Sequence, residues 1–151
     1  MKLAEALILR ADHQTRIFQL RQRLSRSARV QEGEQPPENP QELIAELETL
    51  SAELTQLIQR INRTNSTTEL RDRLLSDALA ERDILRLKRE TYEGVIDAAT
   101  VRSDRYMRSE LRLVSTINVA DVQRQIDRLS RDYRELDAQI QAMNWATDLI
   151  E

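Results

Sequence analysis

Few residues in this sequence have the types and spacing needed for acid–base or metal chemistry. His13 is the only histidine, and the chain has no cysteine. A di-iron centre in a helical bundle needs Glu-x-x-His from each of two helices, and Ser–His or Cys–His nucleophiles also need a suitably placed histidine. The absence of cysteine excludes thiolate zinc sites, and neither a P-loop nor a G-x-G-x-x-G motif occurs. We therefore predict no catalytic residue, no metal site and no cofactor.

Polar residues that suit binding fall near one expected end of the folded chain. Asn62, Arg63 and Asn65 follow a predicted helix, and Asn144 with Trp145 lies near the end of another. Asn and Thr at helix ends usually cap the backbone, and the tryptophan could close the end of a bundle. The alternative is a small polar pocket at this end.

A second group, rich in arginine, is expected at the opposite end. Arg105 and Arg108 lie close to Glu110 in the sequence, and the topology predicted below brings Arg26 and Arg29 to the same end. Since several glutamates accompany these arginines, a solvated network of ion pairs is one interpretation. A binding site for an anion is the other.

The composition predicts the elements that must position these residues. The 151 residues include only two Gly and three Pro, with 32% charged and 3% aromatic side chains, which is typical of long helices packed through aliphatic cores. This length fits a single helical-bundle domain over residues 1–151. A core with so few large side chains also suggests self-association. The net charge of −3 gives no support for nucleic-acid binding.

Heptad spacing predicts an antiparallel bundle of about four long helices over residues 2–29, 40–63, 76–104 and 119–147. Two of them carry unbroken apolar stripes with spacings of three and four residues, the mark of coiled-coil packing. The stripe of the second helix contains Leu43, Leu47, Leu50, Leu54, Leu57 and Ile61. The stripe of the fourth contains Val119, Val122, Ile126, Leu129, Tyr133, Leu136, Ile140 and Met143.

The other two helices have weaker stripes. The first is expected to bury Leu3, Leu7, Ile17, Leu20 and Leu24, with Arg10 and Gln14 on the same side. The third is expected to bury Ala78, Leu85, Tyr92, Val95 and Ala99. Gly94 lies inside the third helix, where a glycine costs about 1 kcal/mol relative to alanine. A close approach of another helix at Gly94 is our hypothesis for why it is tolerated.

Charge predicts how the first two helices pair. Residues 14–30 contain five arginines and no acid, whereas residues 32–58 contain seven glutamates and no basic residue. An antiparallel turn at Pro36-Pro37 places the basic half beside the acidic half. Each surface pair contributes little energy, but the whole pattern favours this topology over its alternatives.

Residues 109–119 show a different pattern. Leu111, Leu113, Ile117 and Val119 alternate with polar residues, which predicts a short extended arm or β-hairpin. A lone strand has unpaired backbone groups, so this arm needs a partner in the same chain or in another copy.

Short ordered blocks along the chain resemble those of the septicolysin-like family of small bacterial helical proteins. The blocks are Met1–Leu7, Val30–Glu34, Ile61–Asn65, Asp104–Tyr106 with Arg108–Glu110, and Asn144-Trp145. The resemblance implies a small helical protein, and the family name implies a pore-forming cytolysin. The blocks fall in connections and helix ends, where ligand or assembly contacts could lie. The candidate contacts are Asn62, Arg63, Asn65, Arg105, Tyr106, Arg108, Glu110, Asn144 and Trp145.

The functional prediction is a non-enzymatic helical protein that self-associates and has a structural or interaction role. The apolar run near the N-terminus is too short for a signal peptide or a membrane span, so a cytoplasmic location is expected. We expect a homo-oligomer, with no nucleic-acid or membrane partner and no identifiable small-molecule substrate. One alternative is the membrane-acting toxin that the resemblance implies. The other is a ligand binder or enzyme that uses the Asn62, Asn65 and Trp145 end.

Overall fold

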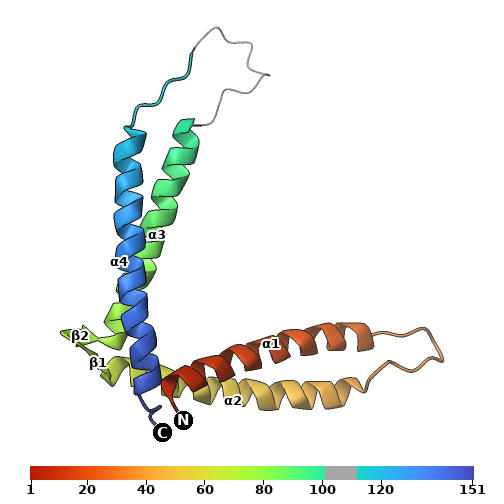
Figure 1. Ribbon diagram of the computed structural model, residues 1–151. Coiled ribbons are helices and arrows are strands. Elements are labelled where there is room, and N and C mark those ends of the chain that lie inside the picture. Colours follow the sequence, from red (N-terminus) through yellow and green to blue (C-terminus); the bar gives the residue numbers. More distant parts are fainter. Residues whose placement is uncertain (101–111) are drawn as a thin grey trace. The chain divides into compact units, whose positions relative to one another are not determined.

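The computed structural model describes residues 1–100 and 112–151, and it is all-α apart from one two-stranded β-hairpin. The helices are α1 (Leu3–Ser27), α2 (Pro40–Thr67), α3 (Leu75–Thr100) and α4 (Val119–Ala146), and the strands are β1 (Glu69–Leu70) and β2 (Arg73–Leu74) (Figure 1). The chain forms two compact units. The first contains Met1–Glu69 and Gln141–Glu151, and the second contains Leu70–Ile140. The predicted fold class is confirmed, while the prediction of a single domain remains a prediction.

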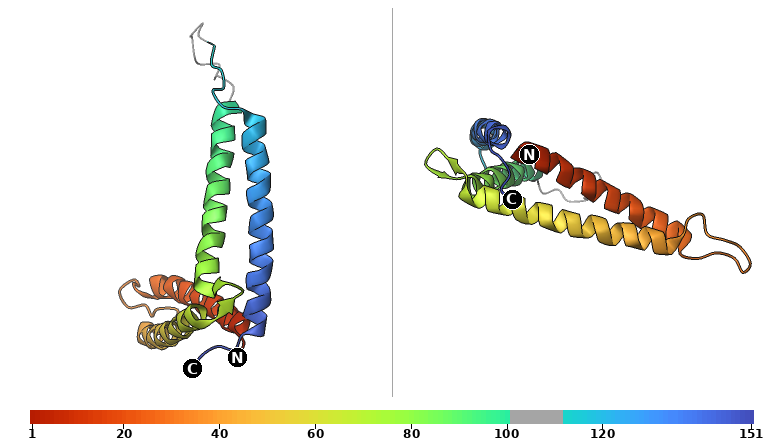
Figure 2. Two further views of the ribbon diagram at one scale, coloured as in Figure 1. Left: turned by 90° about the vertical axis from the view of Figure 1, so that its left-hand side faces the viewer. Right: turned by 90° about the horizontal axis from the view of Figure 1, so that it is seen from below.

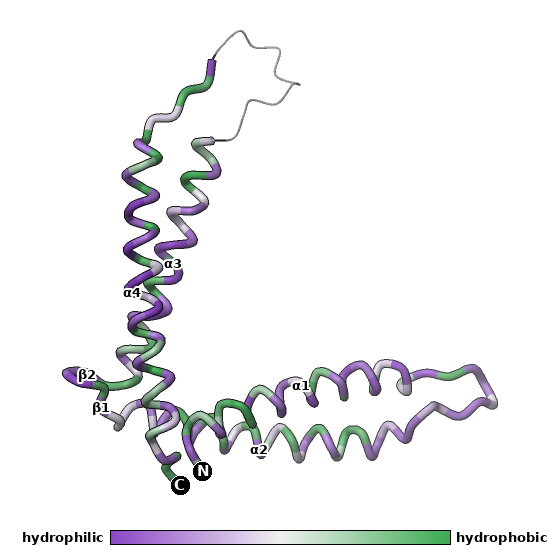
Figure 3. The backbone as a smooth tube through the Cα atoms, in the orientation of Figure 1, coloured by the Kyte–Doolittle hydropathy of each residue, from purple (hydrophilic) through white to green (hydrophobic). Residues whose placement is uncertain are grey.

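In the first unit, α1 and α2 lie side by side and run in opposite directions (Figure 2). Leu20, Leu43 and Leu50 form the centre of their shared core, with Ile17, Leu24 and Leu47 packed against it. The apolar stripe predicted for the second helix is the one that α2 buries. Figure 3 shows the pattern behind this packing, with hydrophobic segments recurring between hydrophilic ones along each helix.

Ion pairs between α1 and the start of α2 confirm the charge-based prediction of an antiparallel hairpin. Arg23 donates to both carboxylate oxygens of Glu38, at 2.6 to 3.2 Å, and also lies 3.7 Å from Glu46. Arg16 lies 3.9 Å from Glu46. The hydrogen bond from Arg23 holds the pKa of Glu38 below its ordinary value. Asn39 caps α2, because its Oδ1 accepts a hydrogen bond from the Gln41 amide at 3.0 Å.

The buried stripe of α1 differs from the prediction by one position at two places. Ala6 and His13 are buried, whereas Leu7 is half-buried and Gln14 is exposed. The observed stripe keeps a strict alternation of three and four residues through Leu3, Ala6, Arg10, His13, Ile17, Leu20, Leu24 and Ser27. The prediction missed this because Leu7 was favoured over the smaller Ala6, and Gln14 was then placed on the stripe in place of His13. Helix geometry, and not the size of the side chain, decides which residue faces α2.

In the second unit, α3 and α4 also form an antiparallel pair (Figures 1 and 2). The predicted stripe of α4 is confirmed at Ile126, Leu129, Leu136 and Ile140, all buried. On α3 the stripe is interrupted by two arginines. Arg82 donates to Asp137 of α4 at 3.0 Å, and the Arg89 guanidinium lies 5.4 Å from the centre of the Tyr133 ring.

The arginines explain why the stripe of α3 looked weak in the sequence. Polar side chains occupy two of the positions that face α4, and their partners come from α4 itself. Val95 was expected on this stripe but is exposed, and the neighbouring Ile96 is half-buried instead. Ile96 comes seven residues, or about two helical turns, after Arg89 and therefore lies on the same side of α3, which faces α4.

The β-hairpin of the described residues lies at residues 69–74, and not within the described part of the arm or hairpin predicted at residues 109–119. The two strands join through Arg71 and Asp72, with Arg71 at φ 60°, and Leu70 is buried. Residues 112–118 form no strand, and residues 109–111 lie outside the described residues. Ser115 instead bonds locally with Ile117, and the Asn118 side chain accepts from the Asp121 amide to cap α4. These local bonds replace the ladder that an alternating sequence would need.

Candidate functional site

The two chain termini and the end of α2 meet in a hydrogen-bonded arrangement that we call the terminal clasp, formed by residues 1–3, residues 147–150, Arg60 and Thr64. The Leu3 amide donates to the Thr147 carbonyl and the Leu149 amide to the Met1 carbonyl, both at 2.9 Å. These bonds form a short antiparallel bridge between Lys2 and Asp148. The terminal clasp therefore fixes the first turn of α1 to the segment that follows α4.

Side chains complete the terminal clasp. The buried Thr64 hydroxyl accepts from the Ile150 amide at 3.1 Å and donates to the Arg60 carbonyl at 2.8 Å. Arg60 Nε in turn donates to the Ile150 carbonyl at 2.9 Å. Lys2 Nζ lies 2.9 Å from Asp148 Oδ1, and its hydrogen bond and positive charge lower the pKa of Asp148.

A hollow of about 270 Å³ lies beside the terminal clasp. It is lined by Met1, Leu9, His13, Glu53, Gln56, Leu57 and Arg60. His13 is 6% exposed, and its Nε2 lies 3.2 Å from Glu53 Oε2. Since a carboxylate accepts, Nε2 carries the proton in this contact. The other ring nitrogen, Nδ1, is buried and has no hydrogen-bond partner among the described residues.

This arrangement lacks the parts of an acid–base or metal centre. Nδ1 of His13 is sealed from solvent, so a molecule in the hollow cannot reach it. The lining contains no Ser, Thr or Cys that the histidine could activate. Within residues 1–100 and 112–151, no group of three or more His, Asp or Glu side chains is placed to hold a metal ion. His13 and Glu53 are therefore a polar pair within the α1–α2 packing.

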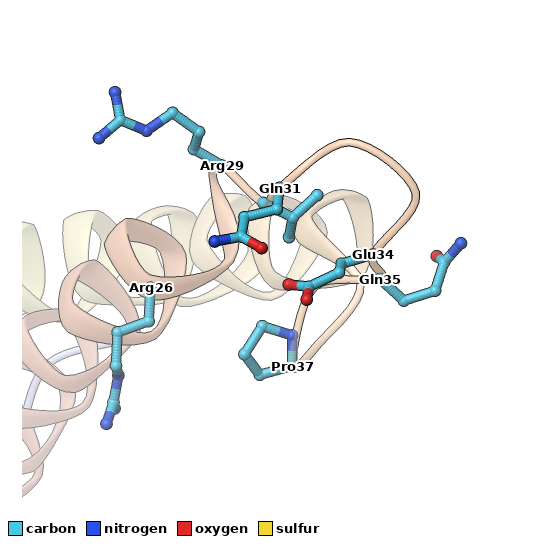
Figure 4. A pocket seen from close by; sticks show the side chains of 7 residues that line it. Arg26, Arg29, Gln31, Glu34, Gln35 and Pro37 are labelled. Carbon is cyan, nitrogen blue, oxygen red and sulfur yellow. The ribbon is translucent and has the colours of Figure 1, made fainter.

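A wider hollow of about 530 Å³ lies at the turn between α1 and α2, where the sequence suggested either ion pairs or an anion site. Its lining includes Arg26, Arg29 and Glu34. Figure 4 shows that the guanidinium groups of Arg26 and Arg29 point away from each other. The two guanidinium groups therefore do not converge on one point of this hollow, and the choice between ion pairs and an anion site remains a prediction.

The structure separates the candidate contacts by exposure. Asn144 is buried, Asn65 is half-buried, and Asn62 and Arg63 are exposed. Trp145 is 56% exposed, so it does not fill the end of a bundle as one interpretation required. Arg105, Tyr106, Arg108 and Glu110 lie outside the described residues.

Sequence reasoning missed the residues that make the terminal clasp. Lys2, Arg60, Thr64 and Asp148 carry its polar contacts, and none was among the candidates. Thr64 lies within the quoted block Ile61–Asn65, so its position was in view although its role was not. The remaining contacts use backbone groups, which have no residue-specific signal.

The sequence matches a family model over residues 10–149, described as a family of unknown function (DUF6847). The chain belongs to this family. It is also similar to a protein from Corynebacterium diphtheriae whose crystal structure is described as that of a functionally unknown conserved protein. The two are 46% identical, with 99% of each chain covered and a TM-score of 0.92. Curated proteins gave no match to this chain.

These comparisons correct the proposed resemblance to septicolysin-like proteins. The family that matches is DUF6847, and neither it nor the Corynebacterium protein indicates a septicolysin-like relationship. The short blocks were too weak individually to identify a family, and the cytolytic activity implied by the name loses its basis. Among the described helices, none combines the length and the apolar character needed to cross a membrane.

We predict that His13→Leu raises the free energy of unfolding by about 1 kcal/mol. An unsatisfied buried polar atom costs about 1 to 3 kcal/mol, and leucine suits this position between two helices. Glu53 is 56% exposed and can be solvated once its partner is removed. Urea denaturation at pH 7 measures the change, with Glu53→Gln as a control that should shift it little. A clear loss of stability in His13→Leu would contradict this account.

We also predict that Asp148→Asn loosens the terminal clasp. Because the folded pKa of Asp148 is depressed, its ion pair stabilises the clasp at neutral pH, and this contribution disappears as the pH falls below about 4. At pH 7 the Leu3 and Leu149 amides should exchange severalfold faster with deuterium in the variant than in the wild type. The difference should fade at low pH.

The matched control is Glu151→Gln, which removes a nearby charge at an exposed position outside the terminal clasp. Its amide exchange should equal that of the wild type. Equal protection of Leu3 and Leu149 in wild type and Asp148→Asn at pH 7 would show that the backbone bonds hold the clasp without the ion pair.

Proposed function

We propose that this protein is a non-enzymatic cytoplasmic helical protein that self-associates and has a structural or interaction role. The observation that supports this proposal is the set of large apolar side chains left exposed on both helical hairpins. Phe18 of α1 is 57% exposed, and Ile84 and Leu87 of α3 are 53% and 56% exposed. Ile8 and Ile44 add to this set on α1 and α2.

The number of helices in each hairpin explains why these side chains are uncovered. A helix with one antiparallel neighbour buries one stripe and exposes the rest of its surface. Covering a half-exposed leucine or isoleucine contributes roughly 1 kcal/mol, so several such residues together favour association. Scattered exposed apolar residues are ordinary on protein surfaces, but several on one helix suggest an interface.

The geometry of the polar sites supports an interaction role more than catalysis. His13 and Glu53 pair with each other across the helices, and the terminal clasp uses its polar groups to join chain segments. Each of these contacts holds backbone or helices in place. A second copy of the chain is the occupant we propose for the exposed apolar residues, because every copy presents the same surface.

We expect the purified protein to have a solution mass that is a multiple of 17.6 kDa across the micromolar range. Sedimentation velocity or light scattering after size exclusion measures this mass. Because apolar burial drives the association, high salt should leave the mass unchanged, whereas contacts made by surface ion pairs would weaken. A strictly monomeric mass at all these concentrations would refute the proposal.

A further inference from the structure

The outward side of α3 carries a second apolar stripe, separate from the one that faces α4. Its members are spaced alternately by four and three residues, which places them on one side of the helix. We call this stripe the outer face of α3, and it consists of Ala80, Ile84, Leu87, Thr91, Gly94 and Ala98. All six residues are exposed, and none is charged. The exposed Val95 lies at its edge.

The partner helix shows what a solvated face looks like in the same hairpin. Five of the seven corresponding outward positions of α4 are charged, namely Asp121, Arg124, Arg128, Arg131 and Glu135, and the other two are Ala138 and Ala142. The outward surfaces of the two helices in this hairpin thus differ in character: that of α4 is mostly charged and that of α3 is apolar. A helix that is apolar on two opposite sides is typical of a helix with two neighbours, and α4 accounts for only one of them.

Gly94 supplies independent support. A glycine inside a helix is less favourable than alanine, and a packing reason normally offsets this cost. Apart from its two neighbouring residues and the adjacent backbone of its own helix, a Cβ atom built at Gly94 would meet no atom of the described residues within 4 Å. The close helix approach that the sequence suggested at Gly94 therefore does not come from within the described residues. A helix from outside the chain would supply it.

We propose that the outer face of α3 pairs in parallel with the same face of a second copy. This inference rests on the proposed self-association and names its surface. In a heptad repeat along the outer face, Ile84 takes position a and Leu87 takes position d. A β-branched residue at a with leucine at d favours parallel two-stranded coiled coils. Thr91, seven residues after Ile84, places a second β-branched residue at position a.

Charges beside the outer face favour the parallel direction. Asp83 and Lys88 flank it five residues apart, which is the spacing of an interhelical pair in a parallel coiled coil. Each copy would therefore offer Asp83 to Lys88 of the other. An antiparallel pairing centred on the same face would place Lys88 near Lys88 and Asp83 near Asp97, which are like charges. Asp83 also contacts Arg82 of its own helix, and a carboxylate can accept several donors.

The apolar surface continues past the end of the outer face. A hollow of about 400 Å³ is lined by Val95, Ala98, Ala99 and residues 113–117. Leu113 and Val114 are among the most exposed large apolar side chains of the described residues. In a parallel pair both copies bring this apolar end together, which lengthens the contact beyond the helix itself.

The first test is Leu87→Glu. A dimer loses two buried leucines and gains two glutamates at its centre, so its dissociation constant should rise about a hundredfold or more. Sedimentation velocity should then find the 17.6 kDa monomer under conditions where the wild type is associated. Ala138→Glu introduces the same side chain on the outward side of α4 and should leave the mass unchanged. Circular dichroism should give wild-type helix content for both variants.

The second test fixes the direction of pairing. Since the chain has no cysteine, Ala98→Cys introduces a single thiol whose disulfide reports one contact only. In a parallel pair the two thiols come close enough to bond under oxidising conditions, as they also should in Ala80→Cys. In an antiparallel pair neither variant forms the disulfide alone, whereas a mixture of the two does.

The possible results distinguish the parallel pairing through α3 from the more general proposal that the protein self-associates. A monomeric wild type would remove both. An associated wild type whose mass Leu87→Glu does not change would overturn the outer face of α3 as the interface and leave self-association intact. Disulfide formation only in the mixture of Ala80→Cys and Ala98→Cys would overturn the parallel direction.

Discussion

Within each hairpin, the burial of one heptad stripe per helix against an antiparallel neighbour is the constraint on which the rest of the structure depends. A helix repeats every 3.6 residues, so a stripe spaced by three and four residues stays on one side along the whole contact. Leu50 of α2 and Ile140 of α4 are buried for this reason, while the adjacent Thr49 and Gln141 are exposed. The same constraint leaves the outward side of each helix without a neighbour inside its hairpin. A continuous row of apolar residues on that side, unlike a single one, therefore suggests a neighbour from outside the hairpin.

Polar residues on the buried stripes show what the packing demands beyond hydrophobicity. His13 meets Glu53, Arg82 meets Asp137, and Arg89 lies over Tyr133. Such pairs usually contribute little net stability, because desolvation offsets the attraction. They do specify register, since sliding one helix by a turn would separate each polar side chain from its partner. Both hairpins therefore combine aliphatic layers that stabilise the pair with polar layers that align it.

The sequence predicted the fold well where the signal is periodic. The stripes of α2 and α4 and the charge blocks of α1 and α2 each repeat over many residues, and the structure confirms them. Prediction from the sequence failed where a single residue or a backbone group determines the local structure. The position of His13 depended on choosing between neighbouring residues, and the alternating pattern near Leu113 forms no strand over the described residues 112–118. The terminal clasp could not be predicted because its central bonds join backbone atoms far apart in sequence.

The contrast between the outward sides of α3 and α4 bears on how an assembly would close. A face that pairs with its own copy in parallel gives a two-fold contact, which uses the whole face and leaves none free for a third chain. The charged outward side of α4, with Arg124, Arg128 and Arg131, would remain in water and resist further stacking of this hairpin. Two apolar outward sides would instead allow copies to add without limit. One apolar and one charged side in the same hairpin are thus the arrangement expected of a helix pair that forms a closed dimer.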